Sequence, residues 1–155
     1  MCCIKYFFIG TSFFIKKNEK KKISEWIKKV INKEWEININ NKSEINLIFC
    51  KDKYLNRKNI KYLKHNNFTD IITFDYSENK KKKIKGDIYI SVDRIKENSK
   101  FYKKSFYKEF KKTIIHGILH LLEYNDISKK LKKEMKKKEK KYINYFLKNN
   151  YISSE

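Results

Sequence analysis

The chain has 155 residues, a length that suits one domain, so we expect a single domain over residues 1–155. An apolar content of 40%, with 15% aromatic residues, excludes a wholly disordered chain. The formal net charge of +21 favours a polyanionic partner, and nucleic acid is a better candidate than an anionic membrane surface. The abundance of lysine over arginine and the absence of alanine also fit an AT-rich codon bias, which could produce this charge without selection for it.

The first half of the chain alternates between strand-like and helical patterns. Residues 4–9 are rich in strand-forming side chains, and residues 45–50 form an apolar run typical of a buried strand. Apolar side chains recur at helical spacing over about residues 22–34, which predicts an amphipathic helix. A shorter helix is expected over residues 52–63.

The second half begins with two further strands and then becomes helical. The strands are expected over 70–76 and 86–92, joined as a hairpin by a lysine-rich loop. Helices are predicted over about 93–100, 105–122 and 127–148. This order predicts an α+β domain in which a small mixed β-sheet packs with about five helices.

The cysteines and the N-terminal segment indicate the cellular compartment in which the protein is expected to work. Cys2, Cys3 and Cys50 do not form a disulfide framework, so we expect a reducing cytoplasm and no disulfide-linked partner. The apolar stretch at the start is short and interrupted by Lys5, and no run reaches the roughly 20 apolar residues of a membrane span. We therefore expect a cytoplasmic protein that does not insert into a membrane.

Two of the three histidines, His116 and His120, lie four residues apart in an apolar segment that is predicted to be helical. Side chains at this spacing project from the same helix face, and two neutral imidazoles so placed can bind one metal ion. The same spacing also fits two core histidines, and spacing alone favours neither interpretation.

A catalytic metal site needs a third ligand and an open position for water. Glu123 lies seven residues after His116 and three after His120, so a continuous helix would place it on the same face. Asp126 lies beyond the predicted helix end and would have to reach back from the turn. Helix geometry alone therefore favours Glu123.

The residue after the first histidine separates two classes of metalloenzyme. Zinc proteases with a His-Glu-x-x-His motif carry their general base directly after the first histidine. Here that position is Gly117. A protease would lack its base, and we favour a nuclease.

The segment HGILHLLEYND (116–126) resembles the signature His-Gly-x-Leu-His-Leu-x-Gly-Tyr-Asp-His of the YbeY family of endoribonucleases. The matching residues are His116, Gly117, Leu119, His120, Leu121 and Tyr124. Glu123 stands where the family usually has glycine, and Asn125 where it usually has aspartate. Asp126 takes the place of the usual third histidine ligand, as in one branch of the family. The resemblance therefore implies a metal held by His116, His120 and Asp126, in preference to Glu123.

Two further segments resemble the same family in the right order. Residues 61–76 match the family's segment before and within the third strand at Tyr62, Thr69, Asp70 and Phe74. Residues 86–91 match its Gly-Asp-Ile-x-Ile-Ser motif.

One departure concerns the expected catalytic residues. The family has an arginine directly after the tyrosine that corresponds to Tyr62, and here that position is Leu63. His65 is our candidate to supply a cation or proton donor in its place, alongside His116 and His120; a surface histidine in a turn is the alternative. Asn66 likewise replaces an acidic residue.

The resemblance implies a zinc-dependent, single-strand-specific endoribonuclease with one Zn²⁺ per chain. It implies action in 16S rRNA 3′ end maturation and ribosome quality control, with ribosomal RNA and the small ribosomal subunit as partners. Two alternatives stay open. One is a non-catalytic ribosome assembly factor with a structural metal, which Leu63 favours, and the other is a metal-dependent hydrolase of another substrate.

Several polar features have simpler structural explanations. Thr69 and Asp70 precede a strand and are expected to cap a turn through local hydrogen bonds, and Ser91 is expected to cap the helix after it. The lysine runs at 80–83 and 136–141 are expected to be solvated faces first and phosphate contacts second.

Overall fold

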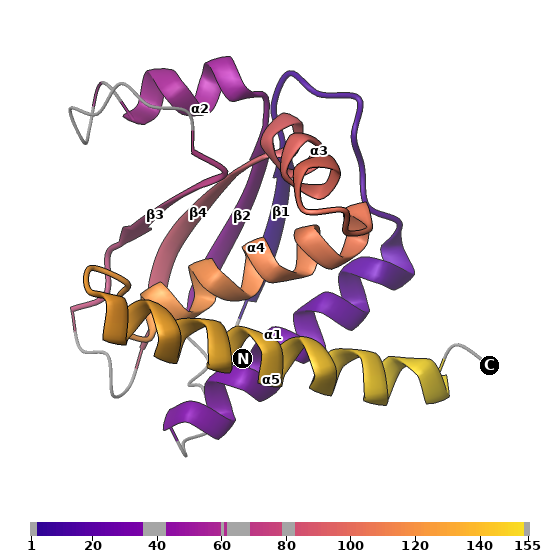
Figure 1. Cartoon of the computed structure of the whole chain (residues 1–155), viewed down its shortest axis with the longest axis vertical. Helices are drawn as coiled ribbons and strands as arrows, with labels where there is room; N and C mark the ends of the chain where they lie inside the picture. The colour runs from indigo at the N-terminus through magenta and orange to yellow at the C-terminus, as the bar shows by residue number, and fades with distance from the viewer. Residues whose placement is uncertain (1–2, 36–42, 60, 62–68, 79–82, 154–155) are drawn as a thin grey trace.

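A computed structural model describes residues 3–35, 43–59, 61, 69–78 and 83–153 (Figure 1). In these ranges the chain forms four strands and five helices, which confirms the predicted α+β class. In chain order they are β1 (Cys3–Phe8), α1 (Lys17–Trp35), β2 (Glu44–Cys50), α2 (Asp52–Lys58), β3 (Ile71–Asp75), β4 (Lys85–Ser91), α3 (Val92–Phe101), α4 (Phe106–Leu121) and α5 (Lys129–Ser153).

The four strands form one mixed sheet in the order β1-β2-β4-β3. β2 pairs in parallel with β1 and with β4, while β3 runs antiparallel to β4, with Ile71 opposite Ile90 and Asp75 opposite Gly86. The predicted strand pair over 70–76 and 86–92 is therefore an antiparallel pair. Residues 79–82 of its lysine-rich connection lie outside the described residues.

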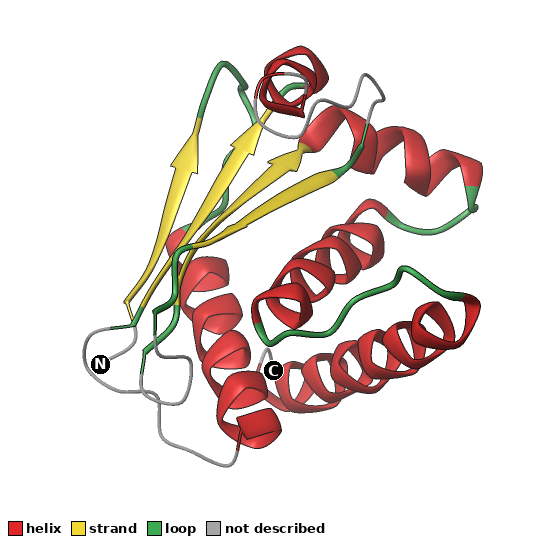
Figure 2. Ribbon diagram, turned by 90° about the vertical axis from the view of Figure 1, so that its left-hand side faces the viewer, coloured by secondary structure: helices red, strands yellow, loops and turns green. Residues whose placement is uncertain are grey.

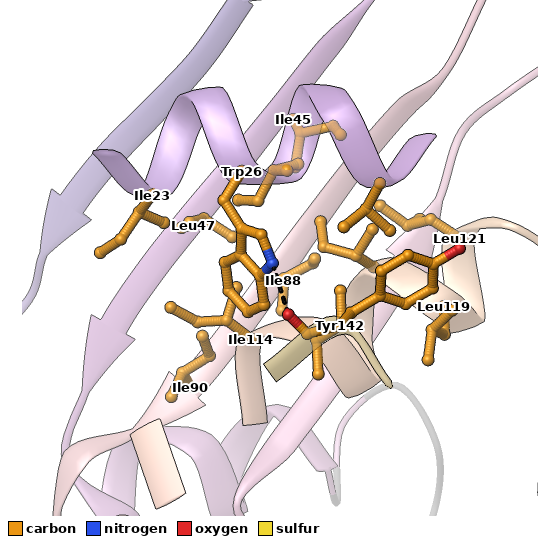
Figure 3. Packing of buried hydrophobic residues seen from close by; sticks show 14 of the residues in the cluster. Ile23, Trp26, Ile45, Leu47, Ile88, Ile90, Ile114, Leu119, Leu121 and Tyr142 are labelled. Atoms are coloured by element: carbon orange, nitrogen blue, oxygen red, sulfur yellow. Dashed lines mark hydrogen bonds between the residues drawn. The ribbon is translucent and has the colours of Figure 1, made fainter. Parts of the chain in front are cut away.

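The main core lies between the sheet and helices α1, α4 and α5, which stack on one face of it (Figure 2). Alternate side chains of β2 and β4, such as Leu47 and Ile88, point into this layer because successive strand residues face opposite sides. The indole N–H of Trp26 donates to the backbone carbonyl of Tyr142 at 3.0 Å, tying α1 to α5 inside the core (Figure 3). α2 packs at the other face, where Leu55 contacts Cys50 and Ile72.

Helix boundaries differ from the predicted ones where no apolar period marks them. α1 begins at Lys17 rather than near residue 22. The prediction started too late because the first turns are lysine-rich and contain no buried side chain, so no apolar period marks them. α5 extends to Ser153 rather than to 148. α2 ends at Lys58, and residues 60, 62 and 63 of the helix predicted over 52–63 lie outside the described residues.

Gly117 allows α4 to lie directly on the sheet. A Cβ atom at this position would lie 2.7 Å from Cδ1 of Ile71 and 2.9 Å from Cγ2 of Ile88, closer than carbon atoms pack. The residue after His116 therefore faces the sheet and has no room for the glutamate that zinc proteases carry there. His116, the residue before it, lies about 100° away around the helix axis and is only partly buried.

A search of the described residues finds no helix with the length and apolar character that a bilayer crossing requires.

Candidate metal centre

His116 and His120 lie one turn apart near the C-terminal end of α4, as their spacing predicts. Their Nε2 atoms are 2.9 Å apart, and both side chains are partly buried. Two ring nitrogens at this distance present their lone pairs or protons to the same small volume. Two histidines placed in this way could act together as ligands of one metal ion.

The chain after α4 turns back on itself and carries Asp126 to the histidines. Glu123 adopts a left-handed conformation with φ of 74°, and the backbone N–H groups of Glu123 and Tyr124 donate to the carbonyls of His120 and Leu119, both at 3.0 Å. This is the Schellman pattern of helix termination. The assumption of a continuous helix, which favoured Glu123 as third ligand, therefore does not hold.

Asp126 is the carboxylate that approaches the histidine pair. Its Oδ2 lies 3.5 Å from Nε2 of His116, and its Oδ1 lies 3.9 Å from Nε2 of His120. Among the described residues, His116, His120 and Asp126 form the group whose ligand atoms all lie within 4.8 Å of one another. Glu123 is exposed and is not part of this group.

A buried carboxylate on α1 anchors this turn. The Glu34 side chain, only 5% exposed, accepts hydrogen bonds from the hydroxyls of Tyr124 and Tyr142 and from Nζ of Lys138 at 3.0 Å. Burial opposes its charge, but these donors outweigh that effect and lower the pKa of Glu34. Because Tyr124 is two residues before Asp126, Glu34 fixes the turn that presents the candidate third ligand.

Glu139 on α5 contacts His116 through the ring nitrogen that faces away from His120. Its Oε1 lies 3.2 Å from Nδ1 of His116, and the residue is 5% exposed. A carboxylate on Nδ1 keeps the proton on that nitrogen and leaves the lone pair of Nε2 for a ligand, as in many metal sites. Glu139 thus selects the His116 tautomer that faces His120 and Asp126.

The two histidines differ in electrostatic environment. Burial disfavours the protonated form of His116, but the hydrogen bond and charge of Glu139, with the charges of Asp126 and Asp70, outweigh it and raise its pKa. Burial and the neighbouring His116 together lower the pKa of His120. The two shifts run in opposite directions, so His120 favours the neutral imidazole more strongly than His116 does.

The group opens into a cleft of about 440 Å³ between β3, α4 and α5. Its lining is mainly charged and polar, with two apolar side chains, and consists of Thr69, Asp70, Ile71, Lys112, Thr113, His116, His120, Asp126, Lys132, Met135, Lys136 and Glu139. Three lysines at the rim of a metal-ligand group suit an anionic substrate.

The remaining predicted residues fall into two groups. His65, Leu63 and Asn66 lie outside the described residues. Ser91 is the N-cap of α3 and accepts from the N–H of Arg94 at 3.1 Å, which confirms its predicted capping role. Thr69 makes local hydrogen bonds with Ile71, as expected of a turn, yet it also lines the cleft.

Asp70 and the lysine run at 136–141 have mixed surroundings. Asp70 accepts from the hydroxyl of Thr113 at 3.5 Å and lines the cleft. Lys136 lines the cleft, whereas Lys138 pairs with Glu34, so the run is not a uniform solvated face.

The distances fit a divalent metal ion with nitrogen and oxygen ligands. With metal–ligand bonds of about 2 Å, neighbouring atoms of a tetrahedral zinc site lie roughly 3.3 Å apart. The Nε2–Nε2 separation of 2.9 Å, and the separations of 3.5 and 3.9 Å that involve the two different oxygens of Asp126, bracket that value. Two imidazoles and one carboxylate also leave a fourth position open to the cleft, as catalytic zinc sites require.

Sequence reasoning missed Glu139 and Glu34. The signal for Glu139 was an acidic residue on the apolar stripe of α5, four residues after Met135 and three before Tyr142, both of which are buried. An unpaired charge in such a stripe is costly, so its presence indicates a partner. Glu34 carries no such local signal, because its partners lie 90 or more residues away.

Comparison with known proteins places this chain in one family. The model of the family described as "Endoribonuclease YbeY" matches residues 12–147. This chain belongs to the YbeY family. Endoribonuclease YbeY of Karelsulcia muelleri is 49% identical over 83% of this chain and 86% of that protein, and the one of Amoebophilus asiaticus is 44% identical over 78% of each.

A solved structure shares the fold. The solution structure of TM1509 from Thermotoga maritima superposes with a TM-score of 0.62 and 25% identity, covering 99% of this chain and 93% of that one.

Proposed function

We propose that this chain is a metal-dependent endoribonuclease that cuts single-stranded RNA, with one zinc ion held by His116, His120 and Asp126. The observation that carries the proposal is the convergence of these ligand atoms in a lysine-rimmed cleft. The names of its relatives support the reaction, since they are called endoribonucleases. We further propose a cytoplasmic role in maturation of the 16S rRNA 3′ end and in ribosome quality control, with the small ribosomal subunit as partner.

The chemistry follows from the donor set. His116, His120 and Asp126 would hold the metal ion, which would supply polarisation of a phosphodiester oxygen or a bound water with a pKa near 7. Glu139 holds His116 in the tautomer that offers Nε2, and the Glu34–Tyr124 contact holds Asp126 in place. Lys112, Lys132 and Lys136 neutralise the RNA phosphates at the cleft rim. We retain His65 as a candidate proton donor.

The assay that tests this function compares a labelled RNA strand, alone and annealed to its complement. We expect cleavage of the single strand and sparing of the duplex. If the purified chain cuts neither ribosomal nor generic single-stranded RNA, the endoribonuclease proposal fails. That outcome favours the assembly factor with a structural metal, which the leucine at position 63 already supports.

The ligand assignment is tested by a pair of substitutions in one turn. Asp126→Ala should weaken metal binding, whereas Glu123→Gly should retain it. The glycine should also stabilise the fold by about 1 kcal/mol, because it relieves the left-handed conformation of a non-glycine residue. Metal competition titrations and thermal melts provide the two readouts. Metal loss in the Glu123 variant alone would transfer the ligand role to Glu123.

A further inference from the structure

Two aromatic side chains stand exposed at the end of α3. Phe101 is 79% exposed and the adjacent Tyr102 is 54% exposed. Their ring centroids lie 5.0 Å apart in an edge-to-face arrangement. Neither ring contributes to the core, so the core does not explain the presence of two large aromatic side chains here.

A lysine connects this aromatic pair to the candidate metal centre. Nζ of Lys112 lies 5.5 Å from the centroid of the Tyr102 ring, and Lys112 itself lines the cleft that holds the histidines. The aromatic pair is therefore contiguous with the cleft rim. Three further lysines, Lys100, Lys103 and Lys104, are exposed in the same stretch of chain.

We propose that Phe101, Tyr102 and Lys112 form a base-stacking subsite for the single-stranded RNA that enters the cleft. An aromatic face stacks on any unpaired base, while lysines around it bind the phosphates on either side. The positive charge of this stretch selects a polyanion over an apolar protein surface. The inference rests on the proposed function, because it takes RNA as the ligand.

The subsite also gives a structural reason for preferring a single strand. In a duplex the base faces are stacked on one another and cannot reach a protein ring, whereas the phosphates stay accessible. The rings should therefore add affinity for the single strand alone. The lysines should contribute to both.

The test replaces both rings by leucine, which keeps apolar bulk and removes the flat aromatic face. Affinity for a short unstructured 2′-O-methylated RNA strand is measured at low salt by fluorescence anisotropy, beside its duplex. We expect the Phe101→Leu/Tyr102→Leu chain to bind the single strand at least about fivefold more weakly than the original chain. Duplex affinity should stay unchanged. Exchanging the two rings, Phe101→Tyr/Tyr102→Phe, should preserve the affinity.

The control is Phe14→Ala, which removes another exposed aromatic ring from a different groove and should leave RNA affinity unchanged. Equal single-strand affinity in the leucine variant and the original chain would overturn the subsite while leaving RNA binding, and so the proposed function, in place. An original chain that binds no RNA at low salt would overturn the proposed function itself. A leucine variant that changes only its oligomeric state in light scattering would make the patch an interface between copies, which also overturns the subsite.

Discussion

Replacing His120 by glutamine should abolish RNA cleavage while leaving most of the RNA affinity. Binding rests on lysines spread over the cleft rim, whereas the chemistry rests on one metal ion held by three side chains. Loss of the metal-activated group should cost about 4 kcal/mol or more of barrier, which is roughly a thousandfold in rate. Glutamine is chosen because it retains polarity and similar bulk at a partly buried position.

The measurement pairs the cleavage rate with the RNA dissociation constant on one folded preparation. A structural metal predicts another pattern, in which the substitution lowers the melting temperature and damages binding and folding together. Cleavage at the original rate by a folded, metal-free His120→Gln chain would rule out a catalytic metal.

Removal of the Glu139 carboxylate should weaken metal binding by about 10- to 100-fold in Glu139→Ala, although this residue is not a ligand itself. Without the hydrogen bond at Nδ1, His116 samples the tautomer whose Nε2 carries the proton and cannot bind the ion. Glu139→Gln should show a smaller loss, because its amide oxygen can still accept from Nδ1. The matched control is Glu134→Ala, an exposed glutamate on the same helix, which should keep the original affinity.

The loss of metal affinity in Glu139→Ala should depend on pH in a definite direction. Glu139 raises the pKa of His116, so it favours the proton as well as the metal. In Glu139→Ala the pKa of His116 should fall, and protons should compete less with the metal on the acidic side. The affinity deficit should therefore be largest above the original pKa of His116 and shrink as the pH falls through it. If the loss of metal affinity does not depend on pH, Glu139 has a structural role only. The same conclusion follows if Glu139→Ala lowers the stability of the metal-free chain and leaves metal affinity unchanged.

The fold was largely predictable because its elements carry strong local patterns. β2 is a largely apolar run and β4 alternates buried and less buried residues, while the pair of histidines sits on a helix whose apolar face packs against the sheet. The antiparallel pairing of β3 with β4 also followed from two neighbouring strand patterns. The early start of α1 was not predictable from periodicity, because residues 17–22 are all polar and none of them is buried.

The candidate site was predictable only in part, since its parts come from separate elements. His116 and His120 follow from spacing along one helix. The approach of Asp126 depends on a left-handed residue at Glu123, where the sequence lacks the glycine that usually marks such a turn. Glu34 and Glu139 reach the site through tertiary packing of α1 and α5. The apolar stripe of α5 indicates that Glu139 has a partner, but no local pattern identifies that partner or predicts the contacts of Glu34.

The central claim, that a metal held by His116, His120 and Asp126 carries RNA cleavage, is tested most directly by removing and restoring the metal. The rate of single-strand cleavage is measured on the original chain as purified, after exhaustive chelation, and after addition of one equivalent of zinc per chain. We expect activity to vanish on chelation and to return at about one bound ion per chain, while RNA affinity stays nearly constant. An undiminished rate in the folded, metal-free chain would contradict the account.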